Sequence, residues 1–174
     1  MPCTQILSGL AKDCAGNIGG IRAVYLANFD DVTGVTVTDG KVSAITMAAS
    51  AKFKKYNFKP GTGSMSSTLN RDLAAGTNYV STDLLLQFNR METAKRVEMT
   101  ALSQGELIAI VKDNNNGFWL LGREEPLNAT AGDGQTGTAR SDGNRYTLTL
   151  QDTSETWPFE ILDTVVTTDI VDEV

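Results

Sequence analysis

The longest alternation of apolar and polar residues in this chain runs through positions 79–89. One side of an extended segment here carries four apolar residues and a threonine: Val80, Thr82, Leu84, Leu86 and Phe88. The positions between them, apart from Leu85, are polar. Because successive side chains of a β-strand point to opposite faces of a sheet, this pattern predicts a long strand with one buried face.

Shorter segments rich in β-branched and aromatic residues predict more strands. They lie at residues 21–27, 34–38, 41–47, 52–59, 106–112, 118–122, 145–151 and 157–161, with weaker candidates at 65–69 and 127–131. Asp39-Gly40 indicates a tight hairpin, since Gly tolerates the positive φ of such a turn. Residues 113–117 form the turn of a second strand pair. The small-residue stretches 61–77 and 132–143 are expected to be mostly loop.

One helix is expected among these strands, at about residues 90–103. Asn89 stands three residues before Glu92, which is the spacing of a capping box. Glu92 can pair with Arg96 one turn later, and Gly105 is a suitable stop. One helix among roughly eight to ten strands predicts a mainly β domain, either a β-sandwich or a partly closed barrel with the helix on one side.

The two ends of the chain lack such periodicity. Residues 1–20 are rich in glycine and predict an irregular N-terminal arm, followed by a single β-rich domain at 21–162. The last segment, 163–174, is an acidic tail with four carboxylates and no base: Asp163, Asp169, Asp172 and Glu173. A length of 174 residues suits one domain with a real core.

The charge of the chain narrows the classes of function. A net charge of −6 and a pI near 4.6 argue against a nucleic-acid-binding protein, because such binding needs a concentrated positive field. The apolar runs are too short to span a membrane, and residues 1–10 lack the basic segment of a signal peptide. Synthesis and use in a cytoplasm is therefore expected, unless a leader was removed. Cys3 and Cys14 could stay reduced or pair, but two cysteines do not make a disulfide scaffold.

The sequence contains no histidine, which removes the commonest general base and metal ligand. Ser-His-Asp and Cys-His catalysis are excluded. Glu124-Glu125 and Asp30-Asp31 are adjacent carboxylates that diverge on an extended chain, so we expect them in solvated turns. The segment from Asp113 imitates part of a calcium loop, but its flanks read as strands. No catalytic residue, metal or cofactor is predicted.

Two charged features remain open. Residues 52–59 interleave four lysines with aromatic side chains. These lysines could bind a single nucleic-acid strand, protect a sheet edge, or pair with an acidic patch on a neighbour. Glu98 falls inside the apolar stripe of the predicted helix, where a carboxylate needs a partner. That partner is either Lys95 at the edge of the stripe or a group on another subunit.

The order of these elements resembles the tail-tube proteins of long-tailed bacteriophages over about residues 79–161. The most telling stretch is a small-residue loop followed by an aromatic residue and alternating Thr and Leu, Gly134-Gln135-Thr136-Gly137-Thr138-Ala139-Arg140-Ser141-Asp142-Gly143-Asn144-Arg145-Tyr146-Thr147-Leu148-Thr149-Leu150. The opening segment from Cys3 to Cys14, with Gly19-Gly20, is similar to uncharacterised virion proteins of phages from gut anaerobes, crAss-like ones included.

This resemblance implies a non-enzymatic virion protein. Such subunits form rings, commonly hexamers, that stack into a tube, so the partners are other copies and other virion proteins. DNA passes through the channel without specific binding, and the acidic charge keeps the genome from sticking. Segments 1–20 and 61–77 and the acidic tail are candidate contacts between subunits. The individual candidates are Lys54, Lys55, Lys59, Glu98, Asp169 and Asp172.

Other functions are compatible with the same residues. A head-tail connector, neck or ring protein of the virion differs from a tube subunit only in the symmetry and length of its assembly. A secreted β-sandwich adhesin would require a leader in the full gene. An enzyme or small-molecule binder of unrecognised type would require a pocket that the sequence does not locate.

Overall fold

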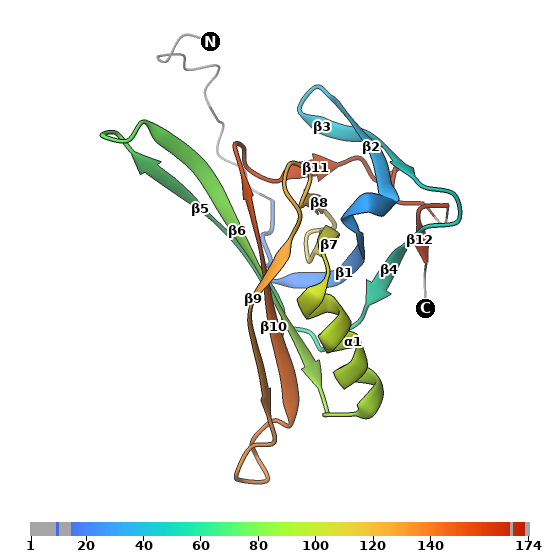
Figure 1. The fold of residues 1–174 in the computed structure, drawn as a ribbon, viewed down its shortest axis with the longest axis vertical. Coiled ribbons are helices and arrows are strands. Elements are labelled where there is room, and N and C mark those ends of the chain that lie inside the picture. The colour runs from blue at the N-terminus through green and yellow to red at the C-terminus, as the bar shows by residue number, and fades with distance from the viewer. Residues whose placement is uncertain (1–9, 11–14, 168, 173–174) are drawn as a thin grey trace.

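The chain folds into two β-sheets and one α-helix (Figure 1). This computed structural model describes residue 10 and residues 15–167 and 169–172. The predicted mainly β fold with a single helix is confirmed. Cys3, Cys14 and most of the predicted N-terminal arm lie outside the described residues.

The larger sheet, which we call sheet A, has eight strands and curls into a half-barrel. In order across the sheet the strands are β12 (Val171–Asp172), β4 (Phe53–Tyr56), β1 (Ile21–Asn28), β7 (Leu107–Asp113), β8 (Phe118–Leu121), β11 (Phe159–Ile161), β3 (Lys41–Met47) and β2 (Val32–Thr38). A short 3-10 helix, η1 (Phe29–Asp31), follows β1. The β2–β3 hairpin turns at Asp39 and Gly40, with φ of 52° and 78°, as the sequence predicts.

The central strands of sheet A are buried on both faces. Val24 and Leu26 of β1 point into a core between the two sheets, whereas Tyr25 between them points into a second core inside the half-barrel. The same division holds in β7, where Val111 faces the first core and Ile110 the second. Burial on both faces explains why these segments are continuous apolar runs and do not alternate.

The smaller sheet, sheet B, has four strands and buries only one face. In order they are β5 (Ser64–Asp72), β6 (Thr77–Asn89), β10 (Arg145–Ser154) and β9 (Asn128–Gln135), with every neighbouring pair antiparallel. The predicted alternation in β6 is confirmed, since Leu84 and Leu86 are fully buried against sheet A. At 13 residues, β6 is roughly 40 Å long and extends beyond the body of the molecule with β5 (Figure 1).

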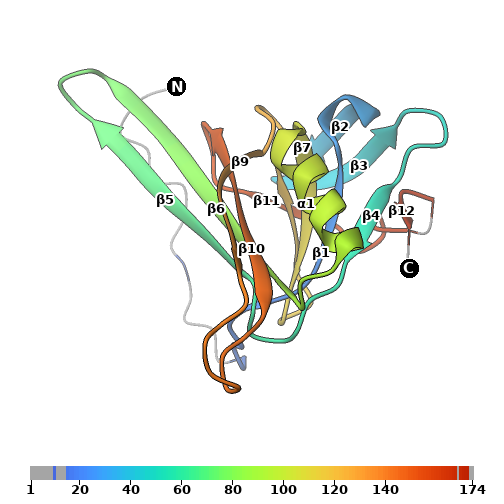
Figure 2. The ribbon, with the colours of Figure 1, turned by 60° about the horizontal axis from the view of Figure 1, so that its bottom comes forward.

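Helix α1 (Thr93–Gln104) closes one side of the sandwich between sheet B and β4 (Figure 2). Leu102 is its one buried residue, and Met99 packs beside it against the core between the sheets. Gly105 follows the last turn, as predicted. The helix is therefore attached along a narrow stripe.

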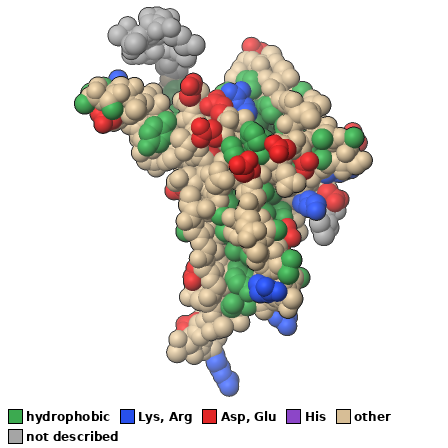
Figure 3. Space-filling view, viewed as in Figure 1, with side chains coloured by type: hydrophobic (Ala, Val, Ile, Leu, Met, Phe, Trp, Pro, Cys, Tyr) green, Lys and Arg blue, Asp and Glu red, His purple; other side chains and the backbone are tan. Residues whose placement is uncertain are grey.

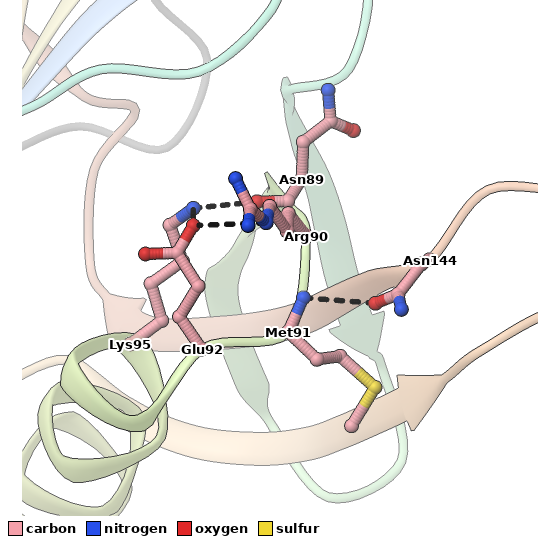
Figure 4. A network of polar contacts seen from close by, with 6 residues as sticks. All are labelled: Asn89, Arg90, Met91, Glu92, Lys95 and Asn144. Atoms are coloured by element: carbon pink, nitrogen blue, oxygen red, sulfur yellow. Dashed lines mark hydrogen bonds and ion pairs between the residues drawn. The ribbon is translucent and has the colours of Figure 1, made fainter.

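The start of α1 differs from the predicted capping box (Figure 4). Asn89 is still paired with Arg145 in sheet B, so its side chain does not cap the helix. Glu92 occupies the N-cap position without a side-chain cap, and the Lys95 ammonium binds both the Asn89 carbonyl at 2.6 Å and the Glu92 carboxylate at 3.1 Å. The predicted pair of Glu92 with Arg96 is thus replaced by one with Lys95.

The same junction depends on a sharp turn between β6 and α1. Arg90 has a φ of 63°, and its backbone N–H donates to the Asn144 carbonyl at 2.7 Å. The next N–H, from Met91, donates to the Asn144 side chain at 2.8 Å (Figure 4). Asn144 therefore ties the start of the helix to the loop before β10.

Two segments expected to be mostly loop contain more strand than predicted, because the weak candidates at 65–69 and 127–131 are parts of longer strands. Most of 61–77 is strand β5 and its turn, in which the Asp72 carboxylate accepts hydrogen bonds from the N–H groups of Ala74 and Ala75. Residues 132–135 belong to β9. Both are exposed edge strands whose order comes from the ladder with a partner strand, so they lack an apolar face that a pattern could reveal.

The predicted acidic tail also enters the fold. Val171 is 3% exposed and packs into the core of the half-barrel, and Val165 and Ile170 pack against the same core. Strand β12 pairs in parallel with β4. The described part of 165–172 is therefore part of the β-rich domain and not a separate tail, and its predicted contact with another subunit stays a prediction.

Candidate assembly surfaces

The outer face of sheet B is a continuous polar surface. Four strands contribute to it in rows, for example Ser66, Asp83, Gln151 and Asn128. The Gln151 amide donates to Asp83 at 2.7 Å and joins the two central strands. The remaining outward residues are mainly serine, threonine, asparagine and glutamine, with Tyr79, Leu85 and Ala131 as exceptions.

The charged groups on this face are mostly acidic. By strand alternation they are Asp72, Asp83 and Asp133 against a single base, Arg145. None of the four strands contains a lysine. The face therefore offers hydroxyl and amide groups with a weakly negative balance and little that would hold a phosphate.

Both edges of sheet B are open. Strand β5 forms one edge and β9 the other. Neither contains proline or lysine, the residues that commonly protect an edge from further pairing. The ladder order makes β5 and β9 run in opposite directions, because three successive antiparallel pairings separate them.

The tip of the β5–β6 hairpin is apolar and exposed. Leu73 is 80% exposed, and Leu69 and Tyr79 are 50% and 41% exposed. Leu73 lies in the turn beyond the last ladder pair, Asp72 with Thr77, and Leu69 and Tyr79 lie within the last four pairs before it. This end of the β5–β6 hairpin projects from the body (Figure 1). A projecting apolar tip gains nothing from the core of its own subunit, so it is a candidate contact with another molecule.

A polar row crosses the core between the sheets. The Ser67 and Thr82 hydroxyls are 2.8 Å apart, and Thr82 is paired with Asp152 on β10. Asp152 is 6% exposed and accepts a hydrogen bond from the Gly122 N–H at 2.8 Å. Burial raises the pKa of Asp152 above its ordinary value, and the nearby Glu124 charge adds to this, against the opposing hydrogen bonds from Gly122 and Thr82.

Asp152 stabilises the segment at 122–127 that connects β8 of sheet A with β9 of sheet B, which we call the crossing between the sheets. Gly122 follows β8, at the point where the chain leaves sheet A, and has a φ of 79°. A Cβ added there would meet the Leu107 carbonyl oxygen at 2.9 Å. Only glycine fits this conformation, and its N–H is held by a carboxylate from sheet B.

The predicted contact residues are distributed over one side of sheet A and α1. Lys54 and Asp172 are partners in the ladder of β4 and β12, so two of the candidates lie side by side within one subunit. Lys55 lies with its ammonium 6.0 Å from the ring centroid of Tyr25. Lys59 is exposed in the turn after β4, and Asp169 is exposed just before β12.

Glu98 has a partner that the sequence did not identify. Its carboxylate accepts a hydrogen bond from the Tyr56 hydroxyl on β4, and Lys95 pairs with Glu92 instead. Burial, together with the hydrogen bond and charge of Glu98, raises the pKa of Tyr56 well above its usual range. The predicted contact between Glu98 and Lys95 is therefore wrong, and the contact with another subunit stays a prediction.

The buried Asp152 and the open edges of sheet B were not predicted from the sequence. Asp152 could have been found, because it continues the apolar side formed by Leu148 and Leu150 in the alternation of β10. The hairpin turn at 113–117 was predicted correctly, and its Asp113 carboxylate accepts hydrogen bonds from the N–H groups of Asn115 and Gly117 and from the Trp119 indole.

Within the described ranges, no group of three His, Cys, Asp or Glu side chains could hold a metal ion. The described part of the chain also has no helix with the length and apolar character needed to cross a bilayer. No family model matches the sequence, no curated protein is similar to it, and no solved structure matches the fold.

Proposed function

We propose that this chain is a structural subunit of a phage virion, a tail-tube protein whose copies form stacked rings around a channel that conducts DNA. The single observation that carries the proposal is sheet B, which has a polar outer face and two open edges of opposite direction. The phage setting comes from the sequence resemblance, and the surfaces of the fold are compatible with it.

Ring formation follows from the strand directions. When copies are related by rotation, β9 of one copy can lie beside β5 of the next as an antiparallel pair. This heterologous contact repeats in every copy and closes when the rotation closes, which produces a barrel without free edges. β5 and β9 have nine and eight residues, so their lengths match.

The outer face of sheet B would then line the channel. Its hydroxyl and amide groups, with Asp83 on the central strand β6 and Asp133 on the edge strand β9, give a hydrated and weakly negative wall. Such a wall repels phosphates and lets DNA move without binding.

Electron microscopy of the purified chain tests the proposal first. Rings or tubes with a central channel are expected, and tubes of variable length would favour a tail tube over a connector or neck ring. A chain that stays monomeric at millimolar concentration, with neither rings nor tubes, would contradict the proposal.

Disulfide cross-linking tests the edge contact itself. Because side chains alternate between faces, outward positions on β5 should cross-link to outward positions on β9 of the next copy. Suitable pairs join Ser66→Cys or Thr68→Cys with Ala131→Cys or Asp133→Cys. The control is Thr36→Cys on β2, an edge of sheet A, combined with Ala131→Cys.

These variants are made in a background with Cys3 and Cys14 replaced by serine. A ladder of covalent oligomers that ends at the size of a complete ring is expected on a non-reducing gel after mild oxidation. The β2 control should remain monomeric. Equal cross-linking of the control and the β5–β9 pairs would contradict the proposed contact between β5 and β9 of neighbouring copies.

A further inference from the structure

A basic pocket lies at one end of sheet A. It has a volume of about 350 Å³ and is lined by Arg22, Ala23, Tyr25, Lys55, Asn57 and Lys112. These residues come from the adjacent strands β4, β1 and β7 and from the residue after β4. Three of the lining side chains are cations and none is an acid, in a chain with a net charge of −6.

The carboxylate next to Lys112 in the sequence is engaged within its own turn. Asp113 follows Lys112, but both of its oxygens are engaged by the turn and by the Trp119 indole. The Lys112 ammonium lies 4.7 Å from the ring centroid of Phe118. Among the described residues, neither Arg22 nor Lys112 pairs with a carboxylate. Arg22 and Lys112 therefore give the pocket the charge and the donors to bind an anion.

The opposite end of sheet A is acidic. Its exposed carboxylates are Asp30, Glu106, Glu125 and Glu155, which we call the acidic end. Backbone hydrogen bonds bring these segments together, from the Phe29 N–H to the Glu106 carbonyl and between Leu107 and Leu127. The Glu155 N–H donates to Glu124 at 2.9 Å. Acidic side chains gather over the upper half of the face in Figure 3.

The register of the sheet places the two charged regions at opposite ends of the same strands. Ile21 pairs with Asp113 beside the basic pocket, and Asn28 pairs with Leu107 beside the acidic end. The eight residues of β1 separate them by roughly 25 Å. Regions of opposite charge at opposite ends of one subunit cannot meet within that subunit, but they can meet between copies in a head-to-tail contact.

We propose that the basic pocket binds carboxylates from the acidic end of a neighbouring copy of this chain. The inference rests on the proposed function, because it names a second contact of the same assembly. It is independent of the β5–β9 contact, since neither charged region includes a residue of β5 or β9. The contact is electrostatic, so rising salt concentration should weaken it more than it weakens the edge contact of sheet B.

Charge reversal tests the contact. The pocket variant is Arg22→Glu with Lys112→Glu, and the acidic-end variant is Glu106→Lys with Glu125→Lys. A third chain carries all four changes. Each two-residue variant should raise the protein concentration needed for assembly by about tenfold or more, and the four-residue variant should return it to within about threefold of the wild type.

The control is Arg96→Glu with Arg140→Glu, which makes the same change of charge as the pocket variant at exposed positions outside both regions. It should assemble like the wild type. Sedimentation velocity measures assembly, and circular dichroism with thermal unfolding checks that each variant is folded.

The outcomes separate this inference from the proposed function. If the wild type assembles and the pocket variant assembles equally well, the inference fails and the proposed function stands. If the pocket variant is impaired but the four-residue variant does not recover, the acidic end is not the occupant and the inference fails. If the wild-type chain never assembles, both the proposed function and this inference are wrong.

Discussion

The two sheets of this protein use their residues differently. The central strands of sheet A are covered on both faces, with one core inside the half-barrel and another against sheet B. Sheet B buries a single face, while its outer face, both edges and the projecting hairpin remain in solvent. The stability of the subunit accounts for the apolar residues of sheet A, but it does not account for an apolar hairpin tip or for unprotected edges.

This difference separates the positions that the folding of the subunit constrains from those that it leaves free. In sheet A, successive positions such as Ile110 and Val111 are both fully buried. In sheet B, only alternate positions are constrained by the core, and the others are free to meet another requirement. The assembly proposal assigns that requirement to contact with neighbouring copies and with the channel.

Neighbouring leucines in β6 give the largest expected contrast. Leu84→Ala removes a side chain with no exposed surface and should lower the free energy of unfolding by about 2–5 kcal/mol. Leu85→Ala, on the outer face, should lower it by less than about 1 kcal/mol. Chemical denaturation of both variants provides the measurement. Equal losses would mean that the outer face of sheet B is also part of a core. The proposed difference between the two sheets would then be wrong.

The crossing between the sheets should be nearly as sensitive. Gly122→Ala places a Cβ against the Leu107 carbonyl in a left-handed conformation, so we expect a loss of about 2–4 kcal/mol in thermal unfolding. Gly40→Ala serves as a control, because Gly40 also has a positive φ but has open space around its Cβ position. Its loss should be about 1 kcal/mol. A tolerated Gly122→Ala would show that the crossing is not tightly packed.

The buried carboxylate of sheet B should make stability depend on pH. The raised pKa of Asp152 means that the folded protein binds this proton more readily than the unfolded chain. Wild-type stability should therefore increase relative to Asp152→Asn as the pH falls from about 7 to about 4, and this advantage should be lost as the pH rises through the folded pKa. Urea denaturation across that range measures it. A difference that is constant with pH, or has the opposite sign, would contradict the assigned burial.

The smallest effect is expected at the helix that bridges the sheets. Tyr56→Phe removes the hydrogen bond to Glu98 and should reduce the free energy of unfolding by about 1 kcal/mol. Glu98→Gln should have a similar effect on stability, and the concentration needed for assembly tests its predicted contact with another subunit: an unchanged value would remove that contact. A changed assembly concentration would instead support the contact of Glu98 with another subunit.

Sequence patterns predicted the elements that bury an apolar face, and they located the exposed edge strands only in part, as the weaker candidates at 65–69 and 127–131. The strands around Val24, Leu84 and Val111 were recognised because burial leaves a periodic or continuous apolar signature. Strand β5 has no such signature, since its order comes from the ladder with β6. The helix start was misplaced because Asn89 was claimed by strand pairing with Arg145, a long-range contact that local capping rules do not include.

The candidate surfaces were less predictable than the fold. Lys55 was proposed as a contact, but its pocket partners Arg22 and Lys112 are far from it in the sequence. The pairing of β4 and β7 with β1 is what brings the three cations together. Residues joined by long-range pairing leave no local pattern, so the basic pocket could not be recognised before the strand order was known.

Hydrogen exchange of the isolated and assembled chain tests the central claim, that sheet B is the surface on which copies associate. The account predicts that amides of β5 and β9 exchange rapidly in the isolated subunit and become protected on assembly, while the central strands β1 and β7 are protected in both states. Protection of β5 and β9 that is already complete in the isolated subunit, or that does not change on assembly, would contradict it.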